Sequence, residues 1–408
     1  MRYWIWMTTR KGLTPRGCLR VLASFGDPEA AFLASDAELA KARGLTAKDR
    51  AALADRDLSL ARRIEADCVA RSVGILTIRD PRYPALLRQI SDPPAVLYYL
   101  GTLPDFDESL TLGVVGQRTA TQSGVSAAYR MGKELSEEGC IVVSGCAAGI
   151  DCAAMEGALA GGSPVVGVLG CGVDVVYPAE SRHLYRQIPK NGCLISEYPP
   201  GTAPDRWNFP ARNRILSGLC RGVVVVEAPQ KSGSLNTARH ALEQGRDVFA
   251  MPGKPGDPNC AGSNDLLRQG ASFAENGRDV LADYRYLFPE RPRQTEKSES
   301  FTRSDTYING KEAAPEGADI SPSRKSFDKK DVDKRNIPPY IDVKEAPAGL
   351  LPEEAAILQS LQRGPMPVDL IVNATGIPAQ RILSSLTMLE IKGLILRLPG
   401  GSCALKNR

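Results

Sequence analysis

Short apolar runs alternate with helical patterns through the middle of the chain. Runs with little internal polar alternation occupy residues 110–115, 140–144, 165–169, 193–196, 222–226 and 248–250. Strands that are apolar on both faces are typical of a parallel sheet covered by helices on each side. The pattern therefore predicts an α/β fold with a doubly wound parallel sheet, which we expect over residues 81–288.

The two ends of the chain show different patterns. Residues 1–80 predict an N-terminal helical domain of the SAM or helix-hairpin-helix kind, with helices at 15–23, 28–33, 35–43 and 48–70. Residues 289–350 are rich in Ser, Pro, Lys, Asp and Glu, which predicts a disordered charged linker. Residues 351–408 combine three helical patterns with a two-stranded wing, and this combination predicts a winged-helix domain.

Composition restricts the ligand and the compartment. The 408 residues carry 51 Lys plus Arg and 47 Asp plus Glu, a net charge of +4, so a site for a polyanion must be a local cluster. The 10 cysteines show no C-x-x-C spacing, which argues against a zinc module and a disulfide scaffold and favours a reducing compartment. Because no apolar run approaches the ~20 residues of a membrane span, we expect a cytoplasmic protein without membrane contact.

Four loops that follow apolar runs carry groups suited to an anion. Ligands of an open parallel sheet gather outside the carboxyl ends of its strands. Guanidinium groups, hydroxyls and backbone N–H groups at glycine-rich turns are what a phosphate needs. The candidate binding residues are, in chain order, Gly116, Arg118, Ser144, Gly145, Gly149, Arg206, Phe209, Arg212, Asn213, Arg214, Lys231, Ser232, Gly233 and Ser234.

Each loop also has a purely structural interpretation. Glycine-rich turns occur throughout α/β proteins, Arg212 and Arg214 could pair with carboxylates, and Phe209 and Trp207 could be core residues. The convergence of four such loops on one sheet edge favours a bound anion over this interpretation.

The type of anion follows from what the loops contain. Neither G-x-G-x-x-G nor G-x-x-x-x-G-K-[ST] is present, which argues against NAD and against P-loop nucleotide chemistry. His183 and His240 are the only histidines, and neither stands in a nucleophile–base arrangement in the sequence, so we expect no catalytic residues, no metal and no cofactor. Arginines interleaved with aromatic residues suit single-stranded nucleic acid, where bases stack on rings.

Taken in order, these loops resemble those of the DNA-processing protein A family, also called DprA or Smf. The resemblance covers residues 83 to about 271. The segments that carry it are YPALL at 83–87, SDPPAVLYY at 91–99, VGQRTAT at 115–121, SGCAAGID at 144–151, VLGCGVDVVYP at 168–178, SEYPPGT at 196–202, FPARNRILSGL at 209–219, SGSLNTA at 232–238, EQGRDVFAMPG at 243–253 and GSNDLLRQGA at 262–271.

The resemblance implies a Rossmann-like domain that binds single-stranded DNA with little sequence preference, forms a homodimer, protects incoming DNA and loads the RecA recombinase during natural transformation. It implies that Arg118 contacts phosphate, that Ser144 and Gly145 offer hydroxyl and N–H groups, and that Phe209 stacks on a base. Arg206, Arg212 and Arg214 would add positive charge, and residues 232–234 would close the pocket.

Two positions depart from the family pattern. Met155 stands where members usually carry His, and Asn236 replaces an apolar residue. Because Met155 lies on a helix that should face the sheet, we expect a change in packing there and retained binding.

Two rival functions remain open at this point. The second loop and the segment at 232–237 resemble the nucleotide-monophosphate pocket of phosphoribohydrolases, but no carboxylate follows Thr237 until Glu243, where those enzymes carry a catalytic Glu. The third interpretation is a protein-interaction scaffold, with the N-terminal helices and the winged helix as adaptors.

Overall fold

The structure is a computed structural model that describes residues 1–284 and 352–405, apart from 363, 378, 393 and 399–401. The chain divides into two compact units, residues 1–294 and 295–408. The predicted disordered linker at 289–350 lies outside the described residues. Among the described residues, every helix is too short or too polar to cross a membrane.

The N-terminal residues fold into six short helices. They are α1 (Arg2–Thr8), α2 (Pro15–Phe25), α3 (Pro28–Leu33), α4 (Asp36–Lys41), α5 (Ala47–Leu53) and α6 (Ser59–Ala70). Side-chain caps explain several boundaries: Thr14, Ser35 and Thr46 each accept a hydrogen bond from a backbone N–H of the helix that follows. The single helix predicted at 48–70 is wrong, because residues 54–58 separate α5 from α6.

A nine-stranded sheet forms the centre of the first unit, in the order β1-β2-β6-β5-β4-β3-β7-β8-β9. In this order, every pair of neighbours from β6 onward is parallel, which includes β5, β4, β3, β7, β8 and β9. β2 is antiparallel to both of its neighbours, β1 and β6. The strands are β1 (Gly74–Thr77), β2 (Val96–Gly101), β3 (Thr111–Val115), β4 (Ile141–Ser144), β5 (Val165–Leu169), β6 (Gly192–Ser196), β7 (Gly222–Val225), β8 (Asp247–Ala250) and β9 (Ser272–Phe273).

Helices cover both faces of the sheet, and successive residues of each strand point to opposite faces. Leu112 and Val114 pack with residues of α8 (Gln122–Glu137) and α9 (Ile150–Gly161). Val115 and Val143 pack on the opposite face with α11 (Asn208–Leu219) and α12 (Gly233–Glu243). The remaining helices of this unit are α7 (Ala85–Arg88), α10 (Arg182–Gln187), α13 (Ala261–Arg268) and α14 (Gly277–Ala282). The predicted doubly wound α/β fold is confirmed.

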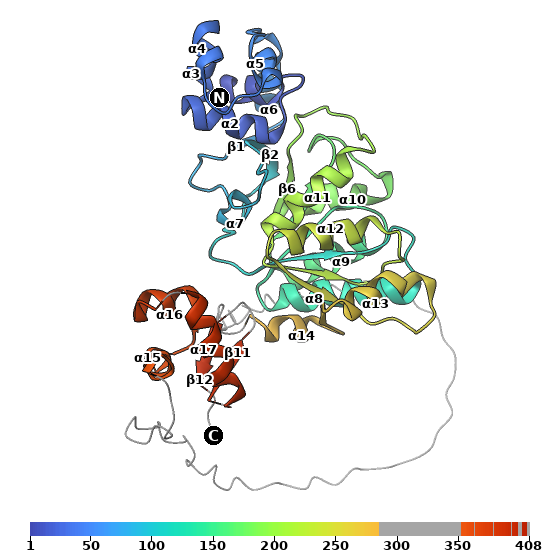
Figure 1. The fold of residues 1–408 in the computed structure, drawn as a ribbon. Helices are drawn as coiled ribbons and strands as arrows, with labels where there is room; N and C mark the ends of the chain where they lie inside the picture. Colours follow the sequence, from blue (N-terminus) through green and yellow to red (C-terminus); the bar gives the residue numbers. More distant parts are fainter. Residues whose placement is uncertain (285–351, 363, 378, 393, 399–401, 406–408) are drawn as a thin grey trace, which may run out of the picture. The chain divides into compact units, whose positions relative to one another are not determined.

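The N-terminal helices lie beside the β1–β2 edge of the sheet (Figure 1). The fully buried side chains of Ile5 and Trp6 belong to the same hydrophobic cluster as Tyr98 of β2, and Arg71 forms an ion pair with Asp174 at 2.8 Å. β1 precedes the domain boundary predicted between residues 80 and 81 and pairs with β2 beyond it. That boundary stays a prediction.

The strand order locates the place where a ligand would bind. The chain passes from β3 through β4 and β5 to β6 in one direction, and then returns to place β7 on the other side of β3. The loops after β3 and β7 therefore diverge to opposite faces and leave a crevice at the carboxyl ends of these strands.

The second unit is a small helical domain with a wing. It contains α15 (Pro352–Leu361), α16 (Val368–Thr375), α17 (Ala379–Ile391) and a three-stranded sheet in the order β10-β12-β11, with β10 (Met366–Pro367), β11 (Ile395–Leu398) and β12 (Ser402–Leu405). Ile357, Ile371, Ile382, Leu386 and Leu389 are among its fully buried core residues. The predicted winged helix is confirmed, with β10 as a third strand that the sequence pattern did not indicate.

Candidate functional site

A pocket of about 660 Å³ lies at the crevice between the loops after β3 and β7. The segments around 115–119, 204–213 and 229–237 supply most of its lining. Ten of the fourteen residues predicted from the sequence line it: Gly116, Arg118, Arg206, Phe209, Arg212, Asn213, Lys231, Ser232, Gly233 and Ser234. The expected convergence of separate loops at one edge of the sheet is therefore present.

Two buried ionisable side chains, Arg212 and Asp151, lie at the base of this pocket. Arg212 and Asp151 are 5% and 7% exposed. The Arg212 guanidinium donates to the Gly145 carbonyl at 3.1 Å, and Asp151 accepts a hydrogen bond from the Gly145 N–H, also at 3.1 Å. Burial raises the pKa of the Asp151 carboxyl, and the positive charge of Arg212 opposes this effect. Burial lowers the pKa of Arg212, and Asp151 counteracts it.

Two glycines near this pair leave no room for a side chain. A Cβ at Gly145 would stand 2.6 Å from both the Arg212 guanidinium and the Asp151 carboxylate. Gly149 has a φ of +79°, and a Cβ there would approach the carbonyl oxygens of Gln117 and Arg118 to 2.5 Å. Both glycines therefore shape the pocket from beneath its lining.

An aromatic group forms one side of the pocket. The half-buried Phe209 ring lies 5.2 Å from the Tyr177 ring, centroid to centroid, with 34° between the ring planes. The Arg118 guanidinium carbon lies 5.5 Å from the Phe209 centroid. Sequence reasoning missed Tyr177, because it lies in an irregular segment 32 residues before Phe209. The sequence signals it only as part of the segment VLGCGVDVVYP at 168–178, where it follows Val175 and Val176.

Three exposed cations surround the opening. Arg118, Arg206 and Lys231 are exposed, and none has an ion-pair partner among the described residues. The Arg206 guanidinium carbon lies 4.8 Å from the Trp207 ring centroid, and Trp207 is 70% exposed. The core interpretation is therefore wrong for Trp207. These cations are free to bind an anion from solution.

The start of α12 adds hydroxyls and a helix N-terminus. Ser232 is the N-cap residue of this 11-residue helix and accepts a hydrogen bond from the Ser234 N–H at 3.3 Å. The two serine hydroxyls are 2.7 Å apart. Asn213 reaches across from α11 and donates to the Gly233 carbonyl at 3.4 Å. The positive end of the α12 dipole favours an anion here.

Four of the predicted residues do not line the pocket. Ser144, Gly145 and Gly149 lie beneath it; the Ser144 hydroxyl is fully buried and donates to the Val114 carbonyl at 2.6 Å. Arg214 faces the other side of α11, because two residues span about 200° of a helix. The structure thus gives Ser144 a hydrogen bond within the sheet in place of the expected phosphate contact.

Arg214 is part of a buried ion-pair network. Its Nη2 atom lies 2.8 and 2.9 Å from the two carboxylate oxygens of Glu197, and its Nε lies 3.3 Å from Asp92. These ion pairs agree with the structural interpretation of Arg214, and its predicted role in ligand binding stays a prediction. For Arg212, by contrast, the side chain does line the pocket.

Met155, where the family pattern has His, is fully buried in the core. Its sulfur lies 3.6 Å from the Cys146 sulfur. Met155 thus packs in the core, as expected for a residue on a helix that faces the sheet, and retained binding stays a prediction.

Comparison with known proteins gives consistent matches. The family model for DNA recombination-mediator protein A matches residues 74–285, and the model for the DprA winged helix domain matches residues 343–401. Protein Smf of Synechocystis sp. is 36% identical over 336 residues, which cover 80% of this chain and 78% of that protein. DNA processing protein DprA of Bacillus subtilis is 39% identical over 221 residues, or 54% of this chain and 73% of that protein.

A solved structure matches as well. The X-ray structure of DNA processing protein A from Streptococcus pneumoniae superposes with a TM-score of 0.60 at 35% identity. The match covers 69% of this chain and 98% of that chain.

Proposed function

This chain belongs to the DNA recombination-mediator protein A family, and from that membership we propose that it is a DNA-processing protein that binds single-stranded DNA in the pocket. The resemblance inferred from the loop motifs is confirmed at the level of the family. The observation that carries the proposal is the combination, in one pocket, of unpaired cations with an aromatic ring pair.

The charge of the pocket favours a polyanion. Four positive side chains line it, Arg118, Arg206, Arg212 and Lys231, against the single carboxylate of Asp151 among the lining residues. Neutralising backbone phosphates with such side chains releases counterions and supplies most of sequence-independent affinity. The pocket can therefore bind DNA although the whole chain carries a net charge of only +4.

The aromatic residues favour single strands over duplex. A base can stack on the Phe209–Tyr177 pair only if it has left its own base stack, and such stacking contributes ~1–3 kcal/mol per base. Arg118 and Arg206 lie over aromatic rings and close to where the neighbouring phosphates would pass. We expect the protein to prefer an oligothymidine strand over the same length of duplex, measured by fluorescence anisotropy.

The wider role rests on the family resemblance. We propose that the protein protects incoming strands, forms a homodimer through the sheet-containing unit and loads RecA. A reducing, cytoplasmic location agrees with the 10 cysteines, none of which forms a disulfide in the described part of the chain. Sedimentation of the purified chain tests the dimer, and RecA strand-exchange assays with and without the protein test the loading.

The charged residues of the winged helix favour binding to a partner protein over reading of the DNA major groove. Two cations associated with α17 pair with carboxylates of α15: Arg381 with Glu353, and Lys392 with Glu354, the latter at 2.7 Å. A major-groove reader needs such side chains free along its recognition helix. We propose that this unit is a dimerisation or partner module, which duplex-binding assays on the full chain and on a chain that ends before it would test.

We infer that neither Glu243 nor Asp151 serves as the catalytic acid that the enzyme interpretation requires. Glu243 ends α12, does not line the pocket and has a side chain 60% exposed. Asp151 is occupied by the Gly145 N–H, with Arg212 nearby. We expect no free base after incubation with nucleoside monophosphates.

A further inference from the structure

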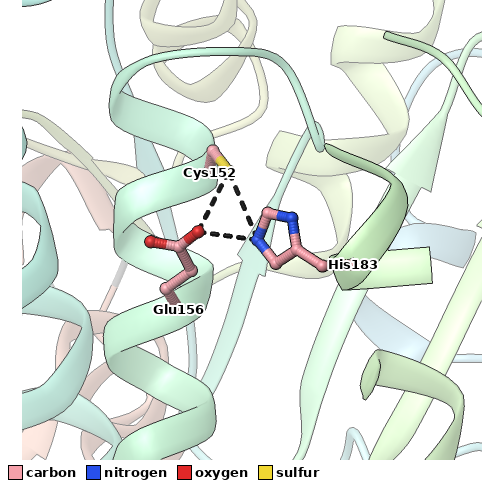
Figure 2. Close-up of side chains that lie close together, drawn as sticks. All are labelled: Cys152, Glu156 and His183. Carbon is pink, nitrogen blue, oxygen red and sulfur yellow. Dashed lines mark hydrogen bonds and ion pairs between the residues drawn. The ribbon is translucent and has the colours of Figure 1, made fainter. Parts of the chain in front are cut away.

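Three potential metal ligands meet outside the pocket. Cys152 and Glu156 lie one turn apart on α9, and His183 lies on α10 (Figure 2). The Cys152 sulfur is 3.5 Å from Glu156 Oε1 and 3.9 Å from His183 Nε2, and Nε2 is 2.6 Å from Oε1. The close-up shows the three side chains pointing toward one another from the two helices.

The histidine ring is oriented as in a metal ligand. Its other nitrogen, Nδ1, lies 3.2 Å from the Glu180 carbonyl oxygen, to which an Nδ1–H can donate. In that tautomer Nε2 carries a lone pair and faces the Glu156 carboxylate at 2.6 Å. Two acceptors at this distance repel one another unless a proton or a cation lies with them. Metal-bound histidines typically donate their second N–H in this way.

The same geometry argues against a nucleophilic triad. In a triad the nucleophile and the orienting acid contact opposite ring nitrogens. Here the Cys152 thiol and the Glu156 carboxylate both face Nε2. The three ligand atoms therefore surround a common point, and they do not form a chain along which a proton could be passed.

We propose that Cys152, Glu156 and His183 form a Zn²⁺ site with its fourth position open to solvent. A sulfur, an imidazole nitrogen and a carboxylate oxygen are ligands that zinc accepts. Tetrahedral zinc places its sulfur ligand ~3.6 Å from the nitrogen and oxygen ligands, close to the separations seen, and its nitrogen and oxygen ~3.4 Å apart. Binding thus requires that His183 Nε2 and Glu156 Oε1 move apart by about 0.8 Å and that Nε2 and the Cys152 sulfur approach by about 0.3 Å.

The surroundings suit an accessible ion. The His183 and Glu156 side chains are 42% and 41% exposed, so an ion can enter and keep a water. The fully buried Ser181 hydroxyl has no hydrogen-bond partner of normal geometry among the described residues and lies beside the Cys152 sulfur. It is placed to donate to a zinc-bound thiolate.

The site would also connect to the DNA pocket. Cys152 directly follows Asp151, and the segment that leads to His183 carries Tyr177, a member of the aromatic pair. Zinc would therefore join α9 to the segment that presents one wall of the pocket. The sequence did not predict this site, because only two of its ligands are close in sequence, one helical turn apart, and the third lies 27 residues further along the chain.

The test is zinc binding by the tag-free full chain. After dialysis against micromolar zinc and then against buffer, we expect about one zinc per chain, and Co²⁺ should give a thiolate-to-cobalt absorption band. C152S should lose the band, and C152S, E156Q and H183A should each weaken zinc binding by at least about tenfold.

H240A is the matched control. His240 faces Glu243 at 3.4 Å on α12, a second His–Glu pair, and the described residues place no cysteine with it. H240A should keep the zinc and the cobalt band, and circular dichroism will establish that each variant is folded. If the wild type takes up no zinc, or if C152S and E156Q take up as much as H240A, the trio is an ion pair of protonated His183 with Glu156 and the proposal is wrong.

Discussion

Replacing Arg118 by Ala should change how DNA affinity depends on salt. Arg118 is exposed, lines the pocket and has no ion-pair partner among the described residues. The same three properties hold for Arg206 and Lys231. If these three cations contact phosphates, the slope of log K against log salt is about −2.1 for a single strand, and Arg118→Ala should reduce it to about −1.4. Between 50 and 200 mM salt the wild type should thus lose about 18-fold in affinity and the variant about 7-fold.

Fluorescence anisotropy of a labelled oligothymidine at four salt concentrations measures this slope. Arg63→Ala is the control: Arg63 is an exposed residue of α6 that does not line the pocket, and its removal should leave the slope unchanged. Equal slopes for Arg118→Ala and the wild type would refute the assignment of Arg118 to a phosphate.

The other predictions concern stacking, stability and domain use. Phe209→Ala should weaken DNA binding by ~1–3 kcal/mol and leave the salt slope unchanged. If the ring is needed only for folding, the melting temperature falls and DNA affinity is lost only through unfolding. Arg214→Ala should cost ~3 kcal/mol of stability in urea unfolding, because it leaves two carboxylates unpaired, while DNA affinity of the folded protein stays. Gly145→Ala should weaken binding by displacing Arg212; wild-type affinity would contradict this. A chain that lacks residues 289–408 should retain most of the affinity for single-stranded DNA. Loss of binding by this chain would place the binding site in the winged helix.

The sheet could be predicted because its central strands are buried on both faces. Six apolar runs correspond to β3–β8 within one or two residues. The antiparallel edge was missed, since β1 is short and β2 follows two prolines and ends at a glycine. The apolar residues 3–7 belong to α1, whose Trp6 is fully buried, and this could not be known without the partners that cover it.

The sequence predicts which loops line the pocket, but not the orientation of each side chain. Motif order places the loops at one edge, and parallel topology then brings them together. Sequence cannot tell that Arg212 faces the pocket while Arg214 faces Glu197, since that depends on the rotation of α11. Tyr177 enters the site only through tertiary packing against Phe209.

The most direct test of single-strand binding in the pocket is a photocross-link. An oligonucleotide that contains 5-iodouracil, irradiated in complex with the full chain and mapped by mass spectrometry, should attach to Phe209 or Tyr177, because a stacked base lies against these rings. An excess of unlabelled single strand, but not of duplex, should abolish the product. Attachment confined to the winged helix or to residues 1–70 would contradict the account.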